Sequence, residues 1–300
     1  MILRLFQNTF DRLGFISVAG LTYEDSEAAL TAGRYWRAAE ILKPLAENGD
    51  PRAQFDLGGM HMMGQGVAQD ETKGTEWILA AAKQGLANAE LAIGSMYWLG
   101  EGFQRDTKLA VDWLGRAAEH GQIEAQFLLG DWYLKGEEVK QDGAAAARFF
   151  RMAAEQGHPR SQNNLAMMYD EGNGIERDQS QAVRWFRAAA EQGHVIAQFN
   201  LGSMYENGEG VEADGAEALY WYQAAGNQGS YEACMAAAEI YEKGELGVPL
   251  DNAFAYAWYS VALKHAGSEE EEQLADEACY RALAKTTPDQ MAGLVKASKK

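Results

Sequence analysis

Small, aliphatic and aromatic residues recur along this chain with a period of 36 residues from residue 53 onward. Within each period, a small residue, a branched aliphatic, a second small residue and an aromatic or histidine stand at positions i, i+4, i+5 and i+8, which form one face of a helix. The last of these columns comprises His61, Tyr97, Tyr133, Tyr169, Tyr205 and Tyr241. A regular period of this kind indicates an array of structural repeats.

A second helix is predicted after a glycine-rich turn in each unit. Gly64 and its equivalents should end the first helix, because glycine adopts the left-handed cap conformation at little cost. An aspartate such as Asp70 should then cap the second helix by accepting backbone N–H bonds. The second helix should pack an aromatic column inward; its members are Trp77, Trp113, Phe149, Trp185, Trp221 and Trp258.

The units must stack, because each has an apolar face that it cannot bury alone. The sequence therefore predicts an all-α fold, a right-handed α/α superhelical solenoid of stacked antiparallel helix pairs with a 36-residue repeat and no β-sheet. An N-terminal capping segment is expected at 1–23 and C-terminal capping helices at 268–300. About seven repeats are expected between them, at 24–52, 53–88, 89–124, 125–160, 161–196, 197–232 and 233–267.

This pattern resembles the Sel-one-like repeat (SLR) family, a relative of the tetratricopeptide repeats. Residues 197–229, AQFNLGSMYENGEGVEADGAEALYWYQAAGNQG, show it most completely. Departures are His61 for tyrosine, Phe149 for tryptophan, Glu138 for a loop glycine and the longer loop GELGVPLD. The resemblance covers about residues 24 to 267. It implies adaptor and scaffold roles in complex assembly and signalling, in bacteria often in host interaction or envelope processes, and no single activity.

Composition excludes several classes of protein. With 44 acidic against 26 basic residues and a net charge of −18, the surface should repel phosphate backbones, so we expect no nucleic-acid partner. The 47% of hydrophobic residues is too high for a disordered chain. Cys234 and Cys279 do not form a disulfide framework. No stretch approaches the roughly 20 apolar residues of a membrane-spanning helix.

The N-terminal residues show helical spacing of apolar side chains, at Ile2, Leu5, Phe6, Phe10 and Leu13. We interpret them as a helix that caps the open end of the array, with a targeting or membrane-surface segment as the alternative. Asp11 and Arg12 interrupt the apolar core that a secretory signal requires. A cytoplasmic location is therefore favoured, and a periplasmic or exported one is the alternative.

Candidate chemistry is sparse. The G-x-G turns follow a helix, whereas a phosphate loop follows a strand. His158 and His194 stand at equivalent positions of adjacent repeats, about 8–10 Å apart, too far for zinc ligands about 2 Å from the metal. No nucleophile–base pair is recognisable. We expect no metal, no cofactor and no catalytic residue. The alternative is an enzyme acting on an envelope polymer, which would need a cleft with converging polar groups of shifted pKa.

The first helices line the concave face in tetratricopeptide-like arrays, and the repeat phase then gives two columns of candidate residues. The candidates are Phe55, Met62, Leu91, Trp98, Phe127, Leu134, Asp170, Glu206 and Glu242. Met63 and Leu99 extend the apolar part, whereas the column becomes acidic from Asp170 onward. We hypothesise a protein or peptide partner that is apolar toward one end and basic toward the other. The alternative is that the apolar side chains pack against the N-terminal region or neighbouring loops.

Overall fold

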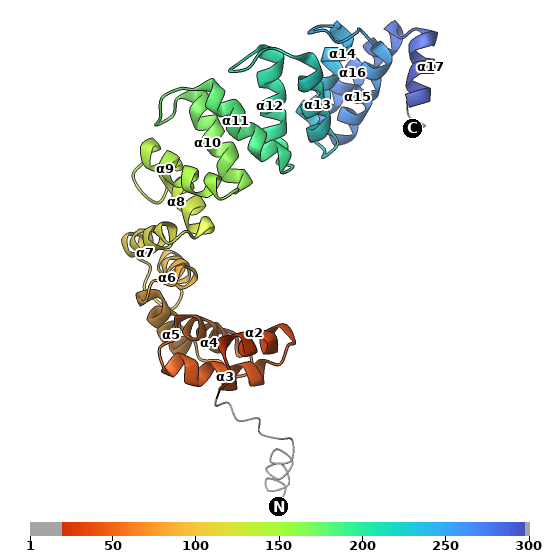
Figure 1. The fold of residues 1–300 in the computed structure, drawn as a ribbon. Helices are drawn as coiled ribbons and strands as arrows, with labels where there is room; N and C mark the ends of the chain where they lie inside the picture. Colours follow the sequence, from red (N-terminus) through yellow and green to blue (C-terminus); the bar gives the residue numbers. More distant parts are fainter. Residues whose placement is uncertain (1–19, 298–300) are drawn as a thin grey trace, which may run out of the picture. The chain divides into compact units, whose positions relative to one another are not determined.

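A computed structural model describes residues 20–297, and this part of the chain contains helices and turns without any β-strand (Figure 1). Most of the predicted N-terminal segment 1–23 lies outside the described residues. The chain forms two compact units, Met1–Gln126 (unit 1) and Phe127–Lys300 (unit 2), and the division falls within helix α8 (Ile123–Lys135). Each unit is described by itself.

Unit 1 consists of helix pairs. Its helices before α8 are α2 (Tyr23–Thr31), α3 (Tyr35–Glu47), α4 (Pro51–Met63), α5 (Glu71–Lys83), α6 (Ala87–Leu99) and α7 (Thr107–Glu119). The most extensive packing joins α4 to α5 and α6 to α7, and α3 and α5 connect each pair to the next. The predicted succession of helix pairs is confirmed.

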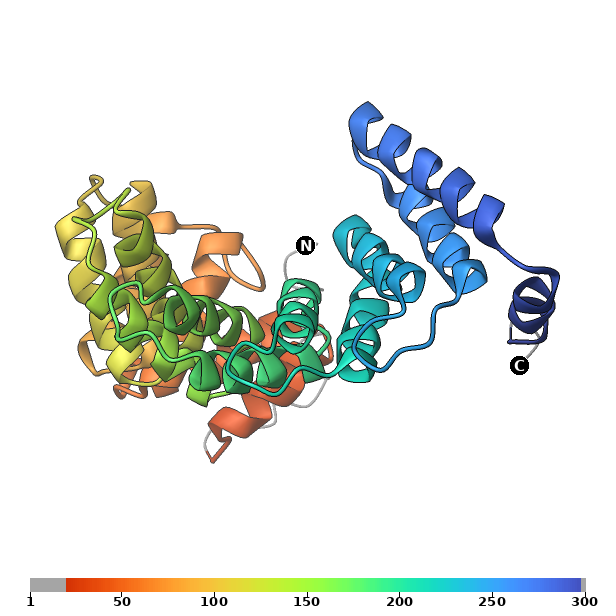
Figure 2. The same cartoon turned by 90° about the horizontal axis from the view of Figure 1, so that it is seen from above.

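Unit 2 continues the same organisation. After α8 come α9 (Gly143–Glu155), α10 (Pro159–Glu171), α11 (Gln179–Glu191), α12 (Val195–Asn207), α13 (Gly215–Gly226), α14 (Tyr231–Lys243), α15 (Asn252–His265), α16 (Glu269–Lys285) and α17 (Pro288–Ala297). The helices α14, α15 and α16 pack in succession at the C-terminal end of this unit (Figure 2). Ser268 caps α16, and Pro288 is the first residue of α17.

The turns have the predicted geometry. Gly64 ends α4 in the left-handed region (φ 67°), and Asp70 accepts the backbone N–H of Lys73 at the start of α5. In four loops the second glycine, at Gly66, Gly102, Gly174 or Gly210, lies against the preceding second helix: a Cβ on Gly174 would overlap the backbone of Gly143. The loops therefore fix the spacing between neighbouring helix pairs.

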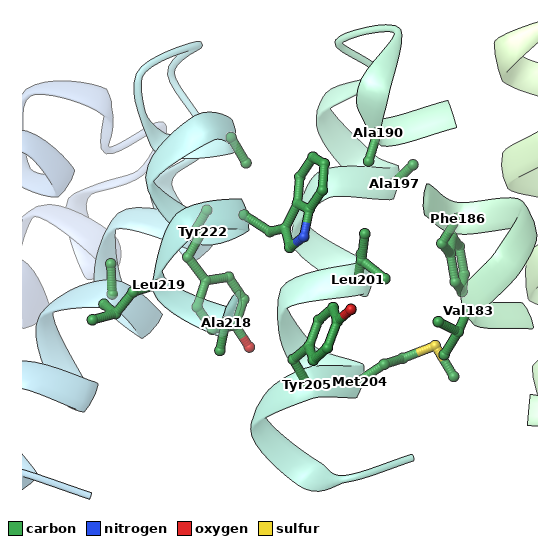
Figure 3. Close-up of a cluster of buried hydrophobic side chains, with 14 of the residues drawn as sticks. Val183, Phe186, Ala190, Ala197, Leu201, Met204, Tyr205, Ala218, Leu219 and Tyr222 are labelled. Atoms are coloured by element: carbon green, nitrogen blue, oxygen red, sulfur yellow. The ribbon is translucent and has the colours of Figure 1, made fainter. Parts of the chain in front are cut away.

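The core of each unit lies between its first and second helices. In the largest cluster of unit 2, Leu201 and Met204 of α12 pack with Phe186 of α11 and Tyr222 of α13 (Figure 3). A Cβ on Gly202 would stand 2.7 Å from the Tyr222 ring, so the small residue of the repeat lets the two helices approach closely.

The aromatic column of the second helices is only partly buried. Trp221 is 7% exposed and Phe149 is 4% exposed, which confirms the predicted core position for these two. The other members are half-buried: Trp77, Trp113, Trp185 and Trp258. Arginine guanidinium groups lie over two of these rings, Arg116 over Trp113 and Arg184 over Trp185. The column therefore combines core packing with cation–π contacts at the surface.

Candidate partner-binding surfaces

In unit 1 the predicted apolar candidates are half-buried. Phe55 and Met62 pack against the core cluster that contains Ile78. The Met62 side chain fills the space beside Gly74 of α5, where a Cβ would stand 2.7 Å from the Met62 sulfur. Leu91 and Trp98 are also half-buried on α6. These four side chains therefore contribute to helix packing as well as to the surface.

The exposed apolar side chains of this surface are the next residues along the chain. Met63 is 65% exposed at the end of α4, and Leu99 is 55% exposed at the end of α6. They hold equivalent repeat positions, so they lie on neighbouring helix pairs, each beside a candidate residue, Met62 or Trp98. We call Met63 and Leu99 the apolar edge of unit 1. Large exposed apolar side chains at adjacent positions are typical of contact surfaces.

In unit 2 the apolar candidates are covered by their neighbours. Phe127 and Leu134 pack against the cluster that contains Phe150. The Phe127 ring lies 6.0 Å from that of Phe150, and the Arg160 guanidinium lies 4.3 Å above it. Phe127 and Leu134 are half-buried, as are the apolar candidates of unit 1.

Two of the acidic candidates are bonded within the chain. Glu206 accepts a hydrogen bond from the Tyr222 hydroxyl at 2.7 Å. Burial and the Glu206 carboxylate raise the pKa of Tyr222 well above its ordinary range. Glu242 accepts from the Tyr259 hydroxyl at 2.9 Å and forms ion pairs with Arg281 and Lys285 of α16, each at 2.9 Å. The bonds from Arg281 lower the pKa of Glu242 to about 2, despite the opposing effect of burial.

The change of polarity along this column therefore has a structural cause. Where the matching position of the second helix is apolar, at Ile78, Leu114 and Phe150, the first helix carries Met62, Trp98 and Leu134. Where that position is a tyrosine, the first helix carries the glutamate that accepts its hydroxyl. For Glu206 and Glu242 the acidic residue thus has a role within the fold, and its charge alone does not indicate a partner.

Asp170 is the acidic candidate that faces a depression of the surface. A hollow of about 150 Å³ lies between α10 and α12, and we call it the acidic hollow. Its lining residues are Met167, Asp170, Glu171, Phe186, Asn200, Ser203, Met204 and Glu209. Within the described chain, no ion pair joins any of its three carboxylates to a basic side chain. One carboxylate oxygen of Asp170 accepts from the Gln179 amide at 3.3 Å.

The field at the acidic hollow favours a cation. Glu171 is the last residue of α10, whose C-terminal end carries the negative pole of the helix dipole. Glu209 follows the end of α12, so a second negative helix end lies at the same place. The thioether and ring carbons of Met167, Met204 and Phe186 supply an apolar part of the lining.

Two histidines that the sequence placed near helix ends have a definite role. The Nδ1 atoms of His158 and His194 accept the backbone N–H of Ser161 and Ala197, at 3.3 Å in each case, and so cap α10 and α12. Burial lowers the pKa of His194, which favours the neutral imidazole that can accept this bond. Repeat spacing gave the equivalence of these two residues but not their capping role.

The strongly shifted titratable groups lie in contacts within the chain. Examples are Tyr23, whose hydroxyl donates to Asp56 at 2.6 Å, and the buried thiol of Cys234, whose pKa burial raises to about 11. Neither these nor the tyrosine–glutamate pairs line the acidic hollow. Both cysteines, Cys234 and Cys279, are free and buried. In residues 20–297 no group of three or more His, Cys, Asp or Glu side chains could hold a metal ion, and no helix could cross a membrane.

Stacked helix pairs with a recurring turn define the class of helical-repeat proteins. Within that class, the chain belongs to the Sel1 repeat family: the Sel1 repeat model matches residues 51–86, 87–122, 123–158, 159–194, 195–230 and 232–265. Sel1 repeat proteins are generally protein-interaction scaffolds and typically not catalysts. The predicted first repeat, 24–52, falls almost wholly outside the matched segments and stays a prediction, although α2 and α3 form a helix pair there.

Two solved structures show the same fold. A Sel1 repeat protein from Oxalobacter formigenes is 29% identical, with a TM-score of 0.60, over 82% of this chain and 97% of that one. A protective antigen present in uropathogenic Escherichia coli strains, which displays an SLR fold, is 28% identical with a TM-score of 0.56. That similarity covers 89% of this chain and 72% of the antigen. No curated protein matches the chain.

Proposed function

We propose that this chain is a non-catalytic scaffold that binds a protein or peptide partner through the surface of its first helices. The Sel1 repeat family supports the general role, since its members are generally protein-interaction scaffolds. The acidic hollow carries the more specific part of the proposal, because within the described residues no ion pair joins its carboxylates to a basic side chain.

The acidic hollow has the chemistry to bind a lysine or arginine side chain of the partner. Such a side chain has an apolar stem and a cationic head. The stem would lie along Met167, Phe186 and Met204, and the head would meet Asp170, Glu171 and Glu209. Hydrogen bonds between ionised groups are shorter and stronger than neutral ones, which favours a basic over a neutral side chain.

In unit 1 the apolar edge would bind apolar side chains of the same or another partner segment. Met63 and Leu99 are exposed, and half-buried Met62 and Trp98 lie next to them in the chain. Tryptophan is enriched among the residues that dominate interface energies, so Trp98 is the expected anchor. Of the candidates from the sequence, Met62, Trp98 and Asp170 take part in this proposal, whereas Glu206 and Glu242 act within the fold.

A peptide selection with matched variants tests this proposal. A random-peptide phage library is selected on the full chain, and the enriched peptides are measured by fluorescence anisotropy at low and high salt. We expect lysine or arginine beside apolar residues in those peptides. We expect binding to the variant Asp170→Asn, Glu171→Gln, Glu209→Gln to be at least about tenfold weaker at low salt, with a smaller difference at high salt.

The control variant removes the same charge elsewhere in unit 2. Glu155, Glu191 and Glu217 are exposed on second helices, and their replacement by glutamine should leave affinity unchanged. Equal loss in both triple variants would mean that overall charge, not the acidic hollow, attracts the peptide. Unchanged binding in the first variant would refute the proposed site.

A further inference from the structure

Buried glutamines connect each helix pair to the preceding one at the same repeat position. These residues are Gln54, Gln126, Gln162 and Gln198, each at most 6% exposed. The Nε2 of each one donates to the backbone carbonyl eight residues earlier, at 2.8–3.1 Å. An amide is suited to this place because it can both donate and accept.

The accepting half of the amide is also used. The Oε1 atoms of Gln54, Gln162 and Gln198 each accept a hydrogen bond from a glutamine 30 residues later, at 2.7–2.8 Å. The donors are Gln84, Gln192 and Gln228. Each of Gln54, Gln162 and Gln198 thus joins its first helix to the second helix before it, through the carbonyl, and to the second helix after it, through the partner glutamine.

One position in unit 1 departs from this pattern. Glu90 of α6 replaces the buried glutamine and is 2% exposed, and His120 at the end of α7 replaces its partner. The His120 Nδ1 lies 2.7 Å from a carboxylate oxygen of Glu90. The carbonyl of Ala82 is the counterpart of the acceptor used elsewhere, and no hydrogen bond from Glu90 reaches it. An ionised carboxylate has no proton to donate there.

The Glu90–His120 pair can hold its extra proton in two arrangements. If the carboxyl is ionised and the imidazole is protonated, the two charges offset each other. If the carboxyl is protonated and the imidazole is neutral, Glu90 can donate to the Ala82 carbonyl as a glutamine does. Both arrangements hold the same number of protons, and the pair titrates as one coupled system. Loss of one proton leaves a buried carboxylate without a counter-charge, which is costly in a low-dielectric interior.

No other charged side chain near Glu90 forms an ion pair with it within the described residues. The charged side chains at the neighbouring helix ends are Lys83 of α5, Arg116 and Glu119 of α7, and Glu124 of α8. Arg116 instead lies 4.7 Å from the Trp113 ring centroid.

We propose that the Glu90–His120 pair makes the packing of α5, α6 and α7 in unit 1 dependent on pH. The pair stabilises this joint while it holds its extra proton, and the joint loosens when that proton is lost. The sign follows from the proton count: the folded joint binds the proton, so its stability is present at lower pH and lost at higher pH.

Thermal unfolding of the full chain and its Glu90→Gln variant, followed by circular dichroism between pH 5.5 and 8.5, tests this proposal. The variant restores the amide used at the other positions, so it should fold. We expect the Tm of the wild type to fall relative to that of the variant by about 2–4 °C across this range. A difference in Tm that stays constant with pH would overturn the proposal.

A second measurement does not depend on global unfolding. The nuclear magnetic resonance signals of the His120 imidazole, followed from pH 5.5 to 8.5, should differ between the wild type and Glu90→Gln, and identical profiles would overturn the proposal. Transfer of the pair to unit 2, by Gln198→Glu with Gln228→His, should add a pH dependence of the same sign.

Discussion

The same repeat column behaves differently in unit 1 and toward the end of unit 2. In unit 1 it holds Met62 and Trp98, opposite the apolar second-helix residues Ile78 and Leu114. Near the end of unit 2 it holds Glu206, bonded to the hydroxyl of Tyr222. The acidic character of Glu206 and Glu242 therefore follows from the tyrosine that the second helix presents to each of them. Polarity alone does not identify a binding residue in a repeat protein.

Equivalent repeat positions can also have different roles within unit 2. Glu206 is bonded inside the chain, whereas Asp170, at the equivalent position one repeat earlier, stands opposite Phe186 and lines the acidic hollow. Phenylalanine offers no hydroxyl to a carboxylate, so the Asp170 side chain is left for the surface. The hydroxyl that Tyr222 has and Phe186 lacks thus distinguishes Glu206, which is bonded within the fold, from Asp170, which is a candidate contact residue.

The largest effect is expected in the aromatic column of the second helices, which both units share. Trp221→Ala should lower the free energy of unfolding by about 3–5 kcal/mol, because it empties a packed site. Trp185 is half-buried under Arg184, so Trp185→Ala should cost less. Urea unfolding followed by circular dichroism measures both. Losses below about 1 kcal/mol for both would show that the column does not contribute to the core.

The next effect concerns the acidic end of the column. Arg281→Ala removes the main partner of Glu242 and should destabilise the docking of α16 by about 1.5–3 kcal/mol, the range for hydrogen bonds to charged groups. Hydrogen exchange of α16 amides measures this loss. Exchange as slow as in the wild type would contradict it, and the exposed Lys264→Ala serves as the control.

The pH dependence of the same contact has a definite sign. The pKa of Glu242 is lowered from 4.5 to about 2 by Arg281, so its stabilising contribution is present above pH 4.5 and lost as pH falls toward 2. Acid unfolding of the wild type, compared with Glu242→Gln, should show the difference between them shrinking over this range. A difference that does not change with pH would mean that the carboxylate charge is not involved.

A smaller effect is expected from the hydrogen bond between Tyr222 and Glu206. Tyr222→Phe leaves Glu206 without its donor and should cost about 0.5–1.5 kcal/mol. Adding Glu206→Leu recreates the pairing of Leu134 with Phe150, so the double variant should be about as stable as the wild type. A double-mutant cycle by urea unfolding measures the coupling. Strictly additive losses would show that the two positions are independent.

The smallest effect on stability is expected at the apolar edge. Met63→Gln with Leu99→Gln should change the free energy of unfolding by no more than about 0.5 kcal/mol, because both side chains are exposed. The same variant should weaken the binding of peptides selected on the chain. A large loss of stability would place these side chains in the fold instead of at a contact surface.

The sequence predicted the fold well because the repeat signals act locally. Left-handed glycines such as Gly64, capping aspartates such as Asp70 and the helical spacing of small residues each determine a short segment, and repetition strengthens the signal. Burial of individual tryptophans was harder to predict: Trp221 is 7% exposed, whereas Trp185 at the equivalent position is half-buried beneath Arg184.

The candidate site was less predictable, because its residues are defined by contacts between helices. Nothing in the spacing of Glu206 and Tyr222 indicates their hydrogen bond, because the column already becomes acidic at Asp170, where the second helix still carries Phe186. Glu171 follows Asp170 directly, but Glu209 reaches the same hollow from the loop after α12. The three carboxylates of the acidic hollow therefore do not belong to a single repeat column.

The most direct test of the scaffold proposal is the affinity of one selected basic peptide for two variants of equal charge. Asp170→Asn, Glu171→Gln, Glu209→Gln should bind it at least about tenfold more weakly than the wild type at low salt. Glu155→Gln, Glu191→Gln, Glu217→Gln should bind it like the wild type. Equal affinities for the two variants would contradict the account, because the acidic hollow would then not be where the partner's cation binds.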